Sequence, residues 1–289
     1  MTGHYPEQLV LSSWNTSLSP PKGSGHAELD FVLETTNRLL KDSDVVYLCE
    51  FDAAAKETSS RLDELTTCYI SDENHFYGKA VKSLCHNQGC VHHKSALIYN
   101  AQLFEKGDEE DQYFYTPNTG LVPGNYRIGQ CVDLRFRASG ADIYFFGSHW
   151  PGHNETDGRD KKSDAARALY AEIMRKSRSN MVVCMGDYNA EPYELPLVEL
   201  GATRSLKFAV EHNCLYNPFW HYLAKDDGTL CYPEQGVYKA YGLLYDQILL
   251  NKQCLQYYSA DAEIVDFKRD LEKGEHKPVR VRLKERSRI

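Results

Sequence analysis

The sequence predicts a single α/β domain over residues 1–289, built around large packed β-sheets. Three observations support this prediction. Short apolar runs recur over the whole length, as buried strands do. Two longer segments between them have helical spacing. No internal repeat, low-complexity tract or long Pro/Gly/Ser linker divides the chain into separate units.

The expected elements follow from these patterns in chain order. A first apolar strand precedes the loop at residues 20–25, and apolar residues at helical spacing follow that loop. Apolar runs of strand length account for most of the remainder. Helices are predicted at residues 29–40 and 163–176, and strands at residues 9–14, 44–50, 95–99, 131–136, 142–147, 181–185, 248–250 and 279–283.

Composition places the chain among ordinary globular proteins. Hydrophobic residues make up 42% and charged residues 26%, which excludes wholesale disorder. The longest apolar run, residues 181–185, is far shorter than the roughly twenty residues of a membrane-spanning helix, so no span is expected. The N-terminus does not have the pattern of a signal peptide, so we expect a cytoplasmic protein whose cysteines are reduced.

The charge balance restricts the class of partner. Lys and Arg number 33 against 41 Asp and Glu, giving a net charge of −8. A protein that holds nucleic acid by charge alone is normally basic, so tight non-specific DNA coating is disfavoured. A nuclease is still compatible with this charge, because bound metal ions can supply positive charge at the site.

Polar residues follow or end several of the predicted apolar strands. A lone Asp after a strand is more often a cap or turn residue, and a lone His beside Trp150 can be an ordinary core residue. Six such strand ends in one chain favour a shared site, because strand ends on one rim of a sheet converge. The candidates are Asn15, Glu50, His149, Asp187, Asn189, Asp246, Glu275 and His276.

These residue types suit the hydrolysis of a phosphate ester. Carboxylate and amide oxygens are the ligands that Mg²⁺ and Mn²⁺ prefer. His149 and His276 add groups that exchange protons near neutral pH. A metal ion neutralises developing charge, a base prepares water, and an acid protonates the leaving oxygen.

The motifs resemble those of the endonuclease/exonuclease/phosphatase superfamily. The run Met185-Gly186-Asp187-Tyr188-Asn189-Ala190-Glu191-Pro192 is similar to the family block Gly-Asp-Phe-Asn-x-x-Pro. Motifs at Trp14-Asn15, Ser148-His149-Trp150-Pro151, Tyr245-Asp246-Gln247 and His276-Lys277-Pro278-Val279 occur in family order. The resemblance implies a four-layer αββα sandwich, with two mixed β-sheets packed face to face and helices outside.

The resemblance also implies a role for each matching residue. Asn15 and Glu50 match the positions that hold the metal, and His149 matches the histidine that contacts the scissile phosphate or leaving group. Asp187 and Asn189 match the pair that orients water and binds phosphate. Two further matches complete the set: Asp246 with the residue that positions the histidines or a second metal, and His276 with a general base or phosphate binder.

Two departures from the family pattern affect the predicted site. Glu275 stands where the family has Asp, so as a metal or histidine contact it must reach its partner differently. Gly152-His153-Asn154 replaces a Ser-Arg sequence common among bacterial members. We therefore expect another arginine to bind the phosphate: Arg127 first, with Arg135 or Arg159 as substitutes.

The favoured function is Mg²⁺- or Mn²⁺-dependent cleavage of phosphodiester bonds in nucleic acid, because the Asp187 and Asp246 motifs are closer to the nuclease and general bacterial branches. The sequence identifies no protein partner. An alternative substrate is a small or lipid phosphate, as for inositol phosphatases or sphingomyelinases; His-Lys-Pro-Val and the net charge of −8 favour it. A third hypothesis is a non-catalytic binding module, suggested by Glu275 and the missing arginine.

Two other patterns receive simpler interpretations. The Cys and His residues within 85–93 lack the paired spacing of a structural zinc site, so a polar loop is preferred. The basic residues between 277 and 288 predict a solvated strand edge and a frayed tail, in preference to a nucleic-acid contact.

Overall fold

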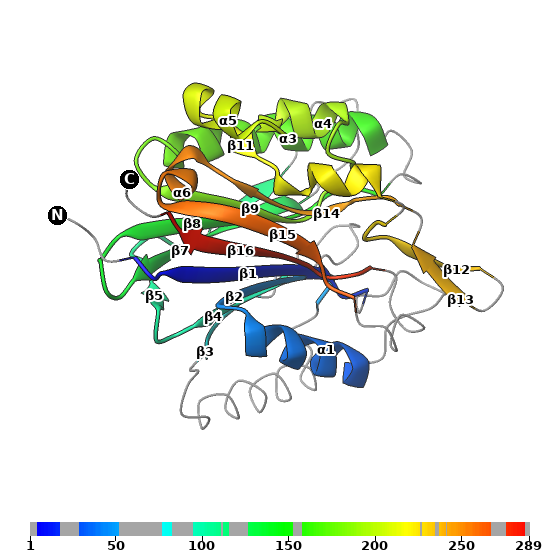
Figure 1. Cartoon of the computed structure of the whole chain (residues 1–289), viewed down its shortest axis with the longest axis horizontal. Helices are drawn as coiled ribbons and strands as arrows, with labels where there is room; N and C mark the ends of the chain where they lie inside the picture. The colour runs from blue at the N-terminus through cyan, green and yellow to red at the C-terminus, as the bar shows by residue number, and fades with distance from the viewer. Residues whose placement is uncertain are drawn as a thin grey trace.

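Two β-sheets pack face to face in the computed structural model of the chain, and helices cover their outer faces (Figure 1). The structure describes residues 5–17, 29–51, 77–82, 95–110, 112–115, 127–152, 158–225, 227–234, 237–240, 242–266 and 276–286. Helix α1 lies against one sheet, and α3, α4 and α5 lie on the far side of the other (Figure 1). The four-layer sandwich predicted from the sequence is therefore confirmed.

The first sheet is mixed. Strands β1 and β2 run parallel, and every other pair of neighbours is antiparallel. Because β1 lies between β2 and β16, the first and last strands of the chain are neighbours in space. In spatial order the strands are β15 (Tyr258–Ile264), β16 (Val279–Glu285), β1 (Gln8–Asn15), β2 (Val45–Cys49), β4 (Ser95–Asn100) and β3 (Tyr77–Lys82).

The second sheet is also mixed, with parallel pairs β8–β9 and β10–β11. In spatial order its strands are β10 (Ala202–Thr203), β11 (Leu215–Tyr216), β14 (Asp246–Leu250), β9 (Met181–Asp187), β8 (Asp142–His149), β7 (Arg127–Phe136) and β5 (Phe104–Lys106). Strand β6 (Gln112–Tyr115) also pairs with β7. A separate hairpin contains β12 (Cys231–Glu234) and β13 (Val237–Ala240).

Helices supply the two outer layers and the connections between strands. The long helices α1 and α3 match the two helical segments predicted from the sequence, although α3 begins five residues earlier than expected. The helices are α1 (Leu29–Asp42), α3 (Gly158–Lys176), α4 (Leu195–Glu199), α5 (Leu206–His212), α6 (Lys252–Tyr257) and the 3₁₀ helix η1 (Pro218–Ala224). Among the described residues, no helix is long and apolar enough to cross a membrane.

Three apolar clusters fill the three interfaces between the layers. Side chains alternate between the faces of a strand, so neighbouring residues enter different clusters. Phe145 of β8 packs between the sheets, whereas Phe146 packs outward against α3 residues such as Leu169. Trp14 of β1 and Val32 of α1 belong to the third cluster, outside the first sheet. Both faces of each sheet are thus buried, which explains the nearly continuous apolar runs in the sequence.

The prediction of a solvated edge at the C-terminus was wrong. Strand β16 lies inside the first sheet and pairs with β1 on one side and β15 on the other. Arg280 is only 5% exposed; its Nη1 lies 3.1 Å from Glu263 Oε1, and its Nε donates to Ser12 Oγ at 3.2 Å. The sequence of β15, Tyr-Ser-Ala-Asp-Ala-Glu-Ile, is too polar to mark it as a strand, so this outer partner was missed.

Candidate active site

The predicted site residues converge at one end of the two sheets. Asn15 ends β1 and Glu50 follows β2, both in the first sheet. In the second sheet, His149 at the end of β8 lies opposite Asp187 at the end of β9. Asp246, the first residue of β14, pairs with Asp187 from the other side. Sheet register and face-to-face packing therefore bring these side chains together.

Asp187 lies at the centre of this group and is 1% exposed. Its Oδ2 accepts a hydrogen bond from Asn15 Nδ2 at 2.9 Å, and its Oδ1 accepts one from the backbone N–H of Asn189 at 2.8 Å. The Nε2 atoms of His149 and His276 lie 3.7 and 3.9 Å from Oδ2. We call Glu50, His149, Asp187, Asp246 and His276 the carboxylate–histidine cluster.

Glu50 is the most accessible carboxylate of the carboxylate–histidine cluster. Its side chain is 20% exposed, against 1% for Asp187 and 0% for Asp246. Its Oε1 lies 3.3 Å from His149 Nε2. The backbone of Glu50 is left-handed, with φ of 52°, and Thr16 Oγ1 donates to its carbonyl at 3.0 Å. This conformation is unfavourable for a residue with a Cβ, and the turn after β2 holds it in place.

Asn15 acts as a hydrogen-bond donor to both neighbouring carboxylates. Its Nδ2 contacts Asp187 and also donates to Glu50 Oε1 at 3.3 Å. Its amide oxygen accepts a hydrogen bond from the Ser17 N–H at 3.0 Å. Asn15 thus holds the two carboxylates in a fixed relation, and its direct contact with a metal stays a prediction.

Asp246 and His276 form a buried pair. Asp246 Oδ2 lies 2.7 Å from His276 Nδ1, and Trp14 Nε1 donates to the His276 carbonyl at 3.0 Å. Burial by itself lowers the pKa of His276, but the carboxylates of Asp246 and Asp187 outweigh burial and raise the pKa to about 10. The ring is therefore held as an imidazolium at neutral pH, with Nε2 on the side of Asp187.

Asn189 contacts the loop that follows β8. Its Nδ2 donates to the Trp150 carbonyl at 2.9 Å and to Asp187 Oδ2 at 3.3 Å. Like Glu50, it has a left-handed backbone, with φ of 46°. Trp150 itself donates from its backbone N–H to the Asp187 carbonyl at 2.9 Å. The ends of β8 and β9 are thus joined by hydrogen bonds next to the carboxylate–histidine cluster.

Gln247 is a supporting residue that the sequence reasoning missed. It is fully buried, and its Nε2 donates to the carbonyls of Ala190 and Leu244 at 2.8 Å each. Its Oε1 accepts from Asn217 Nδ2 at 2.7 Å. The signal was present in the sequence, because a glutamine in an apolar strand needs buried partners. These contacts join the loops on either side of Asp187 and Asp246.

The donor set fits a divalent cation. One carboxylate oxygen each of Asp187 and Asp246 and one ring nitrogen of His276 lie within 4.8 Å of one another. With His276 held as an imidazolium, the carboxylate oxygens are the ligands that a cation can use. Glu50 adds a more accessible carboxylate on the other side of Asp187. Oxygen-rich sets of this kind favour Mg²⁺ or Mn²⁺ over softer metals.

The predicted phosphate-binding arginines and Glu275 are not part of the described cluster. Glu275 lies outside the described residues, as do residues 85–93 and the side chains of Arg127 and Arg159. Arg135 instead forms ion pairs with Asp108 and Asp142, each at 2.8 Å. Asp142 begins β8, at the opposite end from His149, so Arg135 is not a phosphate ligand of this site.

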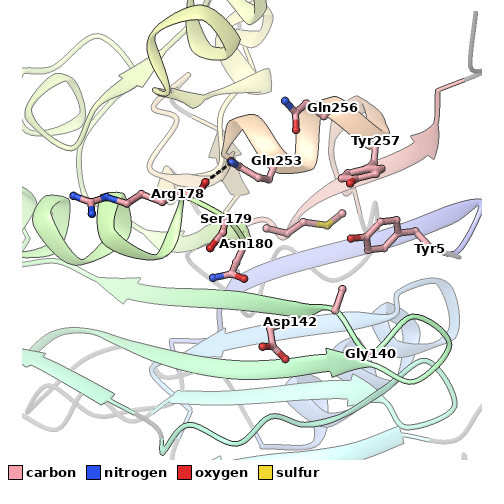
Figure 2. Close-up of a pocket in the computed structure, with 11 residues that line it drawn as sticks. Tyr5, Gly140, Asp142, Arg178, Ser179, Asn180, Gln253, Gln256 and Tyr257 are labelled. Carbon is pink, nitrogen blue, oxygen red and sulfur yellow. Dashed lines mark hydrogen bonds between the residues drawn. The ribbon is translucent and has the colours of Figure 1, made fainter. Parts of the chain in front are cut away.

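A separate cleft of about 480 Å³ lies at that opposite end (Figure 2). Residues from the starts of β8 and β9 line it together with α6 residues, and Gln253 Nε2 donates to the Arg178 carbonyl at 3.1 Å. The rings of Tyr5 and Tyr257, which also line it, are tilted by 54° with centroids 4.5 Å apart. Strand β8 separates the two ends by about 23 Å at 3.3 Å per residue. The cleft therefore does not contact the carboxylate–histidine cluster.

Gly186, just before Asp187, is required by the close approach of β8. Its φ is 144°, and an added Cβ would lie 1.9 Å from the Ser148 carbonyl oxygen. We expect Gly186→Ala to reduce the free energy of unfolding by about 3 kcal/mol or more, because two backbones must separate. Urea denaturation measures this loss.

Gly140 provides the matched control, because its φ is 67° and nothing lies within 4 Å of an added Cβ. Gly140→Ala should cost only about 1 kcal/mol, the price of the left-handed conformation alone. Equal losses in the two variants would show that the contact with Ser148 is unimportant.

Comparisons with known proteins identify the family and the fold. The model of the Endonuclease/Exonuclease/phosphatase family matches residues 77–281. No curated protein matches the sequence. Among solved structures, the human Nocturnin catalytic domain with bound sulfate anion has a TM-score of 0.65 at 16% identity, covering 98% of this chain and 96% of that one.

Two structures from Bacteroides thetaiotaomicron are similar in the same way. An endonuclease/exonuclease/phosphatase family protein has a TM-score of 0.64 at 14% identity, covering 96% of this chain and 98% of that one. A mannosyl-6-phosphatase has a TM-score of 0.62 at 14% identity, covering 95% and 99%. At such identities these structures support the fold alone, and the family model, which covers more than half of the sequence, supports membership. The chain belongs to the endonuclease/exonuclease/phosphatase family.

Proposed function

We propose that the protein hydrolyses phosphodiester bonds in nucleic acid with Mg²⁺ or Mn²⁺ as cofactor. Membership of the family supports phosphoester hydrolysis in general, and its structural neighbours include Nocturnin and a mannosyl-6-phosphatase. The choice of a diester is our inference. It rests mainly on the charges that surround Asp187 and Asp246.

Among the described residues, Asp187 and Asp246 form ion pairs only with histidines. A phosphate monoester carries a charge of about −1.5 to −2 at pH 7, whereas a diester carries about −1. A carboxylate-rich site with few fixed cations repels the monoester more strongly. This arrangement therefore favours the diester.

The contacts suggest a division of roles. Asn189 Nδ2 donates both of its hydrogen bonds within the protein, to Trp150 and Asp187. Its Oδ1 can therefore accept a hydrogen bond from the attacking water. Asp187 lies beside that water position and can accept its proton. Imidazolium His276, oriented by Asp246, offers a positive N–H to the phosphate, and His149 can contact the leaving group.

Glu50 would hold the cation, with Asn15 fixing the relation between its carboxylate and that of Asp187. When bound there, a divalent cation supplies positive charge that stabilises the phosphate in the transition state. The accessible position of Glu50 suits this role, because the other carboxylates of the carboxylate–histidine cluster are almost fully buried.

A smaller substrate is the second candidate. The net charge of −8 weakens binding to nucleic acid, and the closing motif His276-Lys277-Pro278-Val279 is shared with phosphatases acting on inositol phosphates. Lys277 is 8% exposed, and its Nζ lies 2.8 Å from Asp227 Oδ1, beside His276. Its charge is already matched by Asp227, so the closing motif and the net charge are what favour the smaller substrate.

A substrate panel tests both candidates. It comprises plasmid DNA, single-stranded DNA, RNA, bis(p-nitrophenyl) phosphate, p-nitrophenyl phosphate, inositol phosphates and mannose 6-phosphate, each with Mg²⁺, Mn²⁺ or EDTA. We expect kcat/KM for the artificial diester to exceed that for the artificial monoester at least about tenfold, and EDTA to remove the activity. The Glu50→Gln variant, purified in parallel, controls for contaminating nucleases.

Each other outcome of the panel has a definite meaning. Faster hydrolysis of the monoester would replace the diester proposal by the phosphatase alternative. Cleavage that persists in EDTA would contradict the metal requirement. No hydrolysis of any substrate would favour the non-catalytic binding module.

A further inference from the structure

A buried lysine of α3 contacts the loop that carries Asp187 and Asn189. Lys162 is 2% exposed, and its Nζ donates a hydrogen bond to the Asn189 carbonyl. Lysine is almost never fully buried without a polar partner, because removing an ammonium from water is costly. A hydrogen bond from a charged donor is also stronger than a neutral one. The contact thus places a strong hydrogen-bond donor on the backbone of Asn189, a residue of the candidate site.

The Asn189 carbonyl accepts one of the four hydrogen bonds that fix the position of this residue. Its N–H donates to Asp187 Oδ1 at 2.8 Å, and its Nδ2 donates to Trp150 and Asp187. The carbonyl accepts from Lys162. Together these bonds hold a left-handed backbone, with φ of 46°, that would otherwise relax toward a more favourable conformation.

We propose that Lys162 is a positioning residue for the hydrolytic reaction, acting through Asn189. This inference rests on the proposed function, because it assigns Asn189 Oδ1 and Asp187 to the attacking water. The ammonium holds the peptide after Asn189, which keeps the N–H on Asp187 and the amide oxygen in place. A displacement of about 1 Å in such a group costs roughly a hundredfold in rate. Sequence motifs do not reveal this role, because Lys162 belongs to none of them.

Lys176 is a matched control on the same helix. Its side chain is 3% exposed, its ammonium pairs with the Glu109 carboxylate, and it lies 4.2 Å above the Tyr144 ring. It is fourteen residues further along α3, about 21 Å away at 1.5 Å per residue. Methionine at either position removes a buried ammonium and keeps an unbranched side chain. Both variants should therefore lose stability, but only Lys162→Met should lose catalytic efficiency.

The test is a double-mutant cycle with Lys162→Met, Asn189→Ala and the combined variant, assayed on bis(p-nitrophenyl) phosphate. We expect Lys162→Met to lower kcat at least about tenfold, the usual scale for a residue that orients a functional group. KM and Mn²⁺ affinity should change less than about threefold, because this contact does not touch Glu50. The double variant should be no slower than Asn189→Ala alone, and Lys176→Met should keep the wild-type kcat.

Three results would overturn the inference: an unchanged kcat in Lys162→Met, fully multiplicative losses in the double variant, or an equal loss of kcat in Lys176→Met. If Lys162→Met does not fold, Lys162→Gln takes its place in the double-mutant cycle. Glutamine is shorter and neutral, so this variant also removes the charge. A fall in kcat that is independent of Asn189 would again contradict the proposal.

Hydrogen exchange at the Asn189 amide provides a measurement that does not depend on activity. Protection of this N–H, which is bonded to Asp187, should fall at least about tenfold in Lys162→Met and remain unchanged in Lys176→Met. If the wild-type protein hydrolyses no phosphoester, the proposed function fails while this measurement still tests the contact. Wild-type protection in Lys162→Met would exclude the positioning role.

Discussion

Glu50→Gln is expected to lower turnover at least about a thousandfold while leaving the fold intact. The replacement keeps the shape of the side chain and removes the charge of the most accessible carboxylate in the carboxylate–histidine cluster. Metal-based stabilisation of a phosphate transition state contributes several kcal/mol, which corresponds to such a factor. Calorimetry with Mn²⁺ and steady-state kinetics on bis(p-nitrophenyl) phosphate measure the two effects separately.

Glu263→Gln is the appropriate control for this prediction. Glu263 pairs with Arg280 and Arg282 on the first sheet, so its replacement also removes a negative charge from an ion-paired glutamate. It should bind Mn²⁺ and turn over substrate as the wild type does. Equal Mn²⁺ affinity in wild type and Glu50→Gln would remove Glu50 from the metal site.

Asp246→Asn is expected to lower kcat by about 10² to 10⁴, the range seen when a histidine loses the carboxylate that orients it. The Asp246–His276 contact of 2.7 Å fixes the ring and holds Nδ1 as a donor. Asparagine can present an N–H there, which rotates the ring or reverses its tautomer. The pKa of His276 should also fall from about 10 toward its ordinary value of 6.5, because the negative charge that raises it is gone.

NMR titration of His276 and steady-state kinetics measure these two effects of Asp246→Asn. Asp133→Asn is a matched control, since Asp133 is 3% exposed on β7 and accepts the Glu109 N–H at 3.1 Å. It should change stability without changing kcat. An unaltered His276 pKa in Asp246→Asn would show that the pair is not coupled in solution.

The fold could be predicted where burial left a continuous apolar run. Strand β9 and helix α3 were both expected, because the strand is buried throughout and the helix packs an apolar face on the second sheet. Strand β15 could not be predicted in this way, because its exposed face and small residues hide its pairing with β16. Short strands such as β10, with two residues, carry too few positions for any periodicity.

The site could be predicted because polar side chains are costly at the ends of buried strands, so several of them together indicate a function. That argument identified Glu50, Asp187 and Asp246, which the register of the sheets then brought together. It could not identify Lys162 or Gln247, whose importance depends on backbone carbonyls that no sequence pattern places. The carboxylate partners of Asn15 Nδ2 were likewise decided by tertiary contacts.

The left-handed backbones of Glu50 and Asn189 have a consequence for protein engineering. Each holds a Cβ in a conformation that costs about 1 kcal/mol, and glycine would relieve that cost. A stabilisation campaign that ranks positions by backbone energy would therefore select Gly at 50 and 189. Both changes would delete a side chain of the site, so gains in melting temperature at these positions should come with loss of function.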